Sequence, residues 1–163
     1  MTDNKPHSIL ENVKAKIAKD ERKTQILDYL LSGNAFFTLE SSSKNIRYTY
    51  SITRKKKTQP YYKITRLYGP NNEKDYRHVG VFNVDTFYFH LTKTDKRDKC
   101  AQLIIAFFTV LCDENMPWPT HCKYYKAKRC GLCHRLLTTI ESIERGYGPH
   151  CYELVNKSEG GQI

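Results

Sequence analysis

A cysteine-rich segment near the C-terminus, residues 130–151, constrains the fold more than any other part of the chain. It reads CGLCHRLLTTIESIERGYGPHC, in which Cys130 and Cys133 form a C-x-x-C pair and Cys151 follows a Gly-Pro turn. Such a pair can place two thiolates on one tight loop, about 2.3 Å from a tetrahedral Zn²⁺. The segment between the cysteines has too few apolar residues to form a core of its own, and a metal commonly stabilises such small modules. The segment therefore predicts a structural zinc site on Cys130, Cys133 and Cys151.

A structural zinc site normally has four protein ligands, so this one needs a further residue. Cys122 and His121, just upstream of the C-x-x-C pair, are the candidates that we favour. His134 and His150 are each adjacent to a cysteine of the site, and they would need strained geometry to reach the same ion. The sequence leaves the choice among these four residues open.

The other readings of the cysteines are weaker. The polar residues 1–6 do not resemble a secretory signal, so we expect a reducing cytoplasm in which thiols bind metal or are buried. Cys100 and Cys112 lie in an apolar stretch, where cysteine behaves as a small core residue. The C-x-x-C-H string that ends at His134 also matches covalent haem attachment. Haem attachment requires export, however, and it would leave Cys151 without a role.

Positive charge is concentrated in the middle of the chain. The formal net charge is +10, and residues 35–97 hold thirteen Lys or Arg against five Asp or Glu, a balance of +8. Residues 1–34 hold six Lys or Arg against five Asp or Glu, and residues 98–163 hold eight against seven, so each of these segments has a balance of only +1. A clustered positive field attracts polyanions, and nucleic acid is the first of these. No apolar run approaches the roughly 20 residues that span a bilayer, so no membrane partner is expected.

The spacing of apolar residues indicates an α+β fold. Helical spacing begins at a capping box formed by Ser8 and Glu11, and it ends at Gly33. A period of two follows, which predicts strands joined by hairpins. Asp98 can cap an apolar helix that runs through Leu111. We therefore expect N-terminal helices, a curled antiparallel sheet of about five strands covered by a helix, and a small C-terminal zinc module.

The same pattern divides the chain into four parts. We expect a helical N-terminal arm at residues 1–34 and a basic antiparallel sheet with its core helix at residues 35–114. A zinc-binding module follows at residues 115–155, and a flexible polar tail at residues 156–163.

The cysteine-rich segment resembles a small zinc-finger-like module of many bacteriophage and plasmid-borne proteins of unknown function. The module has the pattern C-x-x-C-G-R-x-L-T-x-x-E-S-I-x-x-G-x-G-P-x-C, and this chain departs from it at His134, where glycine is usual. The upstream strings FFTLESSSKNIRYTYSITRKK and YGPNNEKDYRHVG are similar to the sheet of longer relatives, so the resemblance covers about residues 35–152. It implies zinc binding, a phage-like origin and the bacterial host cytoplasm, and it implies no activity. The positions that follow the pattern are Cys130, Cys133, Arg135, Leu137, Thr138, Glu141, Ser142, Ile143, Gly146, Gly148, Pro149 and Cys151.

One predicted hairpin combines cations with aromatic residues. Cations that hold phosphates, among tyrosines that can stack on bases, are typical of a sheet that binds single-stranded DNA or RNA. We therefore expect a zinc-binding protein that binds nucleic acid. The alternative is an anti-defence or regulatory protein that binds a host protein or sequesters a nucleotide signal. The sequence does not indicate catalysis, because no nucleophile, base and oxyanion site stand together. The predicted contacts are Arg47, Arg54, Lys55, Lys56, Lys57, Lys63, Arg66, Tyr48 and Tyr61.

Overall fold

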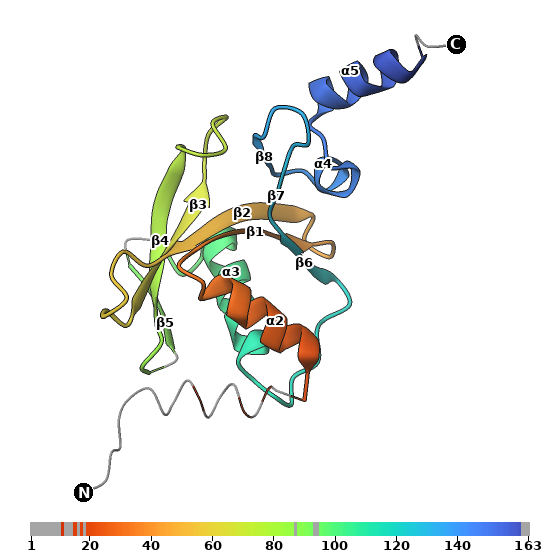
Figure 1. Cartoon of the computed structure of the whole chain (residues 1–163). Coiled ribbons are helices and arrows are strands. Elements are labelled where there is room, and N and C mark those ends of the chain that lie inside the picture. The colour runs from red at the N-terminus through yellow and green to blue at the C-terminus, as the bar shows by residue number, and fades with distance from the viewer. Residues whose placement is uncertain are drawn as a thin grey trace, which may run out of the picture.

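The computed structural model describes residues 11, 15, 17, 19–86, 88–92 and 95–160, with the backbone alone for 158–160. It is an α+β structure built on a six-stranded antiparallel sheet whose strand order is β5-β4-β3-β2-β1-β6 (Figure 1). The strands are β1 Asn34–Ser41, β2 Ile46–Thr53, β3 Tyr61–Leu67, β4 Tyr76–Asn83, β5 Tyr88–Leu91 and β6 Cys122–Lys126. The helices before and within this unit are α2 Glu21–Leu30 and α3 Lys99–Leu111.

The registers of the strands place their apolar residues on one face. Phe37 of β1 pairs with Tyr50 of β2, and Ile52 of β2 pairs with Ile64 of β3. Because side chains alternate along a strand, these residues share the face that is packed against the helices. The other face carries small hydroxyl residues, among them Thr38 and its hydrogen-bonded partner on β2.

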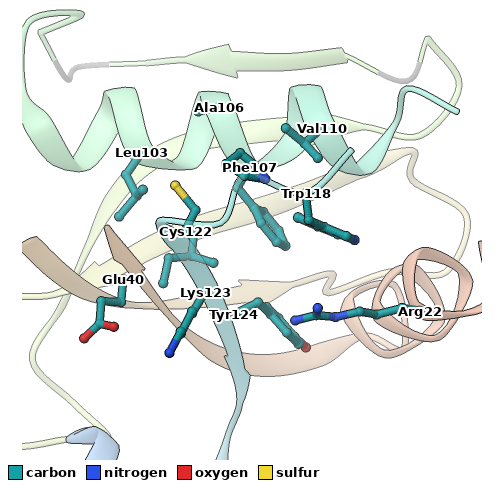
Figure 2. A pocket seen from close by; sticks show the side chains of 12 residues that line it. Arg22, Glu40, Leu103, Ala106, Phe107, Val110, Trp118, Cys122, Lys123 and Tyr124 are labelled. Carbon is teal, nitrogen blue, oxygen red and sulfur yellow. The ribbon is translucent and has the colours of Figure 1, made fainter. Parts of the chain in front are cut away.

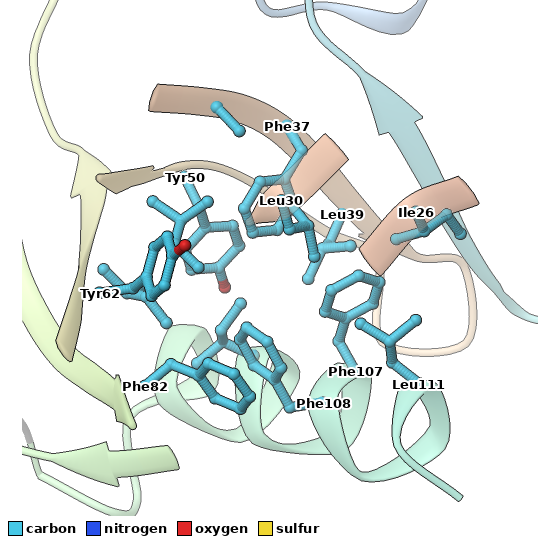
Figure 3. Close-up of a cluster of buried hydrophobic side chains, with 14 of the residues drawn as sticks. Ile26, Leu30, Phe37, Leu39, Tyr50, Tyr62, Phe82, Phe107, Phe108 and Leu111 are labelled. Carbon is cyan, nitrogen blue, oxygen red and sulfur yellow. The ribbon is translucent and has the colours of Figure 1, made fainter. Parts of the chain in front are cut away.

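Helix α3 supplies the apolar surface that covers the sheet. It begins after Asp98, whose carboxylate accepts hydrogen bonds from the first backbone amides, as the sequence predicts. Phe107 stacks on Phe37 of β1 at 5.6 Å between ring centroids, and Phe108 stacks on Phe82 of β4 at 4.8 Å. These aromatic contacts form the centre of the main core, which Figure 3 shows together with apolar side chains from α2.

The sixth strand corrects the expectation of about five strands. Strand β6 lies in the segment that we assigned to the zinc module, and it pairs antiparallel with β1. Its five residues, CKYYK, are too short for a clear period of two. The strand is fixed by long-range contacts instead, since Tyr124 stacks on Phe107 of α3 with 5.7 Å between ring centroids.

The predicted N-terminal helices are described only in part. Helix α2 begins at Glu21, after the Asp20 cap, and its apolar residues end before Gly33 as the spacing predicts. The earlier helix that we predict from Ser8 falls mostly on residues outside the described ranges. In the part of the chain that the structure describes, no helix is both long enough and apolar enough to cross a bilayer.

The C-terminal segment forms a small unit beside the sheet (Figure 1). Two short strands form a second sheet and two helices follow: β7 Lys128–Arg129, β8 Leu136–Leu137, α4 Ile140–Arg145 and α5 Pro149–Gly160. The loop between β3 and β4 holds this unit in place. Asn72 donates a hydrogen bond of 2.6 Å to the carbonyl of Leu136, and Arg129 forms an ion pair of 2.6 Å with Glu73.

Candidate metal centre and basic surface

Three cysteines of the C-terminal unit converge on one point. Cys130 follows β7, Cys133 lies in the turn before β8, and Cys151 lies in the first turn of α5. Their sulfur atoms all lie within 4.8 Å of one another. Four thiolates at about 2.3 Å around a tetrahedral ion would be about 3.8 Å apart, so this spacing is close to that of a metal site. The sequence predicted these three residues as ligands, and the fold brings them together.

The turn between Cys130 and Cys133 has backbone geometry suited to holding a thiolate. The amide of His134 donates to the carbonyl of Cys130 at 3.0 Å, and the amide of Leu132 donates to the Cys130 sulfur at 3.5 Å. His134 has a φ of 63°, the left-handed conformation that glycine adopts most easily. This conformation explains why a glycine would suit the position, as the resemblance implies.

The thiols of the cluster differ in their tendency to ionise. Hydrogen bonds from backbone amides, that of Cys133 first, lower the pKa of the Cys130 thiol to about 6. Burial is the main cause that raises the pKa of the Cys151 thiol to about 11. Cys130 is therefore favoured as a thiolate at neutral pH, and the thiolate is the form that binds a metal.

The structure does not bring the two upstream ligand candidates into the cluster. Cys122 is the first residue of β6, and its side chain lies between β6 and α3 beside Leu103 (Figure 2). His121 is exposed, and its carbonyl accepts a hydrogen bond from the amide of Ser42. Because β6 pairs with β1, the sheet determines the position of both residues.

Two histidines line the space next to the thiols. His150 lines a pocket that all three cysteines also line. His134 lines a separate pocket, to which Cys133 is the one cysteine of the cluster that contributes. No fourth His, Cys, Asp or Glu joins the cluster within the described ranges.

The residues predicted to contact nucleic acid lie on both faces of the sheet. Tyr62 and Ile64 of β3 are buried toward α3, so their neighbours Tyr61 and Lys63 point to the opposite face. Arg47 of β2 points to that opposite face as well, and all three of these side chains are exposed.

Tyr48 and Arg66 belong instead to the face that carries the core. The Arg66 guanidinium lies 4.3 Å from the centre of the Tyr48 ring and 4.0 Å from that of Tyr68. In a similar way Arg54 lies 4.7 Å from the centre of the Tyr62 ring. Because its ring packs against both Arg66 and the core, Tyr48 is less available for stacking on a base than Tyr61, which is 54% exposed.

The cations of the predicted surface have no carboxylate partners among the described residues. The ion pairs among the described residues are Arg97–Asp95 and Arg129–Glu73, and neither pair involves a residue that we predict to contact nucleic acid. Lys55, Lys56 and Lys57 are exposed in the turn between β2 and β3. Among the described residues, these turn lysines therefore form no ion pair, and Glu40 lies opposite Arg47 in the β1–β2 register.

Two aromatic and basic residues were missed by the sequence reasoning. Tyr68 is 45% exposed, and the Arg77 guanidinium lies 5.0 Å from its ring centre. The Tyr68 ring thus lies near two guanidinium groups, those of Arg66 and Arg77. Tyr68 precedes a Gly-Pro sequence that is typical of a turn, and only the pairing of β3 with β4 places Arg66 opposite Arg77.

The comparisons with known proteins concern the C-terminal unit alone. Residues 126–156 match a Family of unknown function (DUF6011), so this segment is similar to that family and contains all three cysteines of the cluster. A search of curated proteins and a search of solved structures gave no match to the chain.

Proposed function

We propose that this protein binds single-stranded nucleic acid through the basic surface around β2 and β3, and that zinc holds its C-terminal unit together. The observation that carries the proposal is the group of exposed cations that form no ion pair among the described residues, next to the exposed ring of Tyr61. Cations that neutralise phosphates, with an aromatic ring on which a base can stack, are the recurring features of single-strand binding. The net balance of +8 in residues 35–97 supports the same conclusion.

The donor set suits zinc. Three thiols within 4.8 Å of one another need only small shifts to bind one tetrahedral ion, and soft thiolates select zinc over magnesium or calcium. The zinc would stabilise a unit whose own buried cluster is small, namely Cys130, Leu137, Ile143 and Cys151. We propose His150 as the fourth ligand, because it lines the pocket that all three cysteines share.

The resemblance of the cysteine-rich segment to modules of phage and plasmid proteins supports an origin on such an element. The place of action would then be the bacterial host cytoplasm.

Fluorescence anisotropy tests the nucleic-acid proposal. Labelled single-stranded and double-stranded oligonucleotides of the same sequence are titrated with the zinc-loaded protein at two salt concentrations. We expect binding to the single strand that weakens steeply as salt rises, because each neutralised phosphate releases counterions. If neither oligonucleotide binds at low salt, the proposal fails, and binding to a host protein or a nucleotide signal becomes the better hypothesis.

A further inference from the structure

An apolar groove lies between α3 and the edge strand β6, which β1 separates from the hairpin of β2 and β3 (Figure 2). Its cavity has a volume of about 40 Å³. A single water needs about 10–15 Å³ by the same measure, so the cavity has room for three or four non-hydrogen atoms, as in the branched end of a Val or Leu side chain. The side chains that form its walls come mainly from α3 and β6: Leu103, Ala106, Phe107, Val110, Cys122 and Tyr124.

The backbone of β6 is open along the same groove. The amide of Ala127 donates to the carbonyl of Phe36, and the amide of Ser42 donates to the carbonyl of His121. In an antiparallel pair, hydrogen-bonded residues alternate with residues whose amide and carbonyl point away from the partner strand. The backbone groups of Tyr124 and Lys126 therefore point outward, and no partner for them lies within the described ranges.

The rim of the groove is positively charged. Arg22 of α2 and Lys123 of β6 both line it, and Glu40 is the single carboxylate among the lining residues. Neither of the ion pairs within the described ranges involves Arg22 or Lys123. Lys126 adds a further cation on β6, where it lies 4.6 Å from the centre of the Tyr29 ring.

We propose that this groove binds an extended peptide segment of another protein, which adds to β6 as a seventh strand. Backbone hydrogen bonds to Tyr124 and Lys126 would give the alignment, and one branched apolar side chain would enter the cavity beside Phe107. Acidic residues next to that side chain would face Arg22 and Lys123. An open strand edge beside an apolar pocket matches a peptide better than a small molecule. A second copy is a poorer partner, because each copy would bring the same cations to the contact.

The probe is a fluorescein-labelled octapeptide, acetylated and amidated, that alternates Thr with Leu between terminal Asp residues. Trp118 is the one tryptophan of the chain and lines the cavity, so its fluorescence reports entry into the groove. We expect saturable binding by anisotropy, together with a change in Trp118 emission. Two matched peptides should bind at least about tenfold more weakly, one with Leu replaced by Ser and one with N-methylated backbone amides.

Two pairs of variants locate the binding. Lys126→Pro removes an amide that points outward, a place where an edge strand tolerates proline, and Lys126→Ala removes the same charge but keeps the amide. The proline should weaken peptide binding about two- to tenfold beyond the alanine, the loss expected for one hydrogen bond. Ala106→Phe fills the mouth of the cavity from an exposed position of α3 and should weaken binding about tenfold or more. Gln102→Phe, exposed on the same helix but outside the groove, should leave binding unchanged.

The proposal is independent of nucleic-acid binding, so the Lys55, Lys56 and Lys57→Ser variant should still bind the peptide. Circular dichroism confirms that each variant is folded before it is compared. The proposal is overturned if the peptide does not bind, if Ala106→Phe and Gln102→Phe behave alike, or if the N-methylated peptide binds as well as its parent. It is also overturned if sedimentation shows a dimer that Lys126→Pro dissociates, since β6 would then be the contact between two copies.

Discussion

Cys122 and His150 show how position in the fold decides the role of a metal-ligand residue type. Both were candidates on sequence, and Cys122 was preferred because it lies upstream of the C-x-x-C pair without being adjacent to it. In the structure Cys122 is held in the β6–α3 groove, whereas His150 lines the pocket of the three cysteines. The sheet thus removes the preferred residue from the cluster, and the turn before α5 brings the less favoured one near it.

We predict that His150→Ala weakens zinc binding about tenfold or more, while Cys122→Ser and His121→Ala leave it unchanged. The reason is that His150, of the four candidates on sequence, is the one that lines a described pocket with all three cysteines. Competition with a coloured chelator measures the affinity, and elemental analysis of the purified wild type should give one zinc per chain. Loss of zinc in Cys122→Ser but not in His150→Ala would contradict the assignment.

Tyr61 and Tyr48 also differ in role although they lie on adjacent strands. We predict that Tyr61→Ala lowers the affinity for single strands by about 1–3 kcal/mol with little change in salt dependence, because a stacked ring releases no counterions. Tyr48→Ala should instead lower the thermal stability, since its ring packs on Arg66 and the core. Tyr88→Ala is the control that should change neither quantity, because this 58% exposed ring lies on the edge strand β5, two strands away from Tyr61. Equal loss of binding in Tyr61→Ala and Tyr88→Ala would contradict this distinction.

The hairpin of β2 and β3 is the element that carries the basic charge. Its turn presents Lys55, Lys56 and Lys57 to solvent, and its strands add Arg47 and Lys63 on the face opposite α3. The flanking strands hold this hairpin in place, because both its strands are internal to the sheet. The cations are therefore presented from a rigid base, and only the turn itself extends beyond the sheet.

We predict that replacing Lys55, Lys56 and Lys57 with Ser weakens nucleic-acid binding for all sequences alike. The slope of log affinity against log salt should flatten by about two to three units, near one for each lost phosphate contact. Anisotropy at several salt concentrations measures the slope. The control replaces three exposed lysines outside the hairpin of β2 and β3 with Ser, namely Lys44, Lys99 and Lys157. This control variant should keep the wild-type slope. An equal change in both triple variants would show that net charge alone is responsible.

At the scale of the whole molecule, the sheet and the C-terminal unit have separate cores. The main cluster of buried residues and the cluster around Cys130 share no side chain. Two polar contacts connect the sheet to the C-terminal unit, namely the hydrogen bond of Asn72 to Leu136 and the ion pair of Glu73 with Arg129. Tyr125 of β6 also packs against the cluster around Cys130. Loss of one core should therefore leave the other largely intact.

We predict that removal of zinc, by a chelator or by Cys133→Ser, unfolds the C-terminal unit and leaves the sheet folded. Structural zinc contributes folding free energy directly, and the small cluster of the unit cannot replace it. Hydrogen exchange should show lost protection in α4 and α5 and retained protection in β1 to β4. Cooperative loss of protection across the whole chain would mean that the sheet depends on the metal as well.

The sequence by itself determined the features whose cause is local. The C-x-x-C spacing and the Gly-Pro turn predicted the convergence of Cys130, Cys133 and Cys151, because a short loop limits where its thiols can point. Alternation predicted the hairpin strands, and Asp98 predicted the start of α3, because a cap depends on neighbouring amides.

Only the tertiary structure decided the features that depend on distant residues. Strand β6 exists because it pairs with β1, about 85 residues earlier, and packs on α3, so its short sequence carried no clear signal. That pairing keeps Cys122 apart from the three clustered cysteines and forms the groove against α3, and β6 is an edge strand of the sheet that the structure describes. The register of the sheet likewise puts Tyr48 and Tyr61 on opposite faces. Side-chain direction along a strand reverses at each residue, so their roles could not be assigned until the pairing was known.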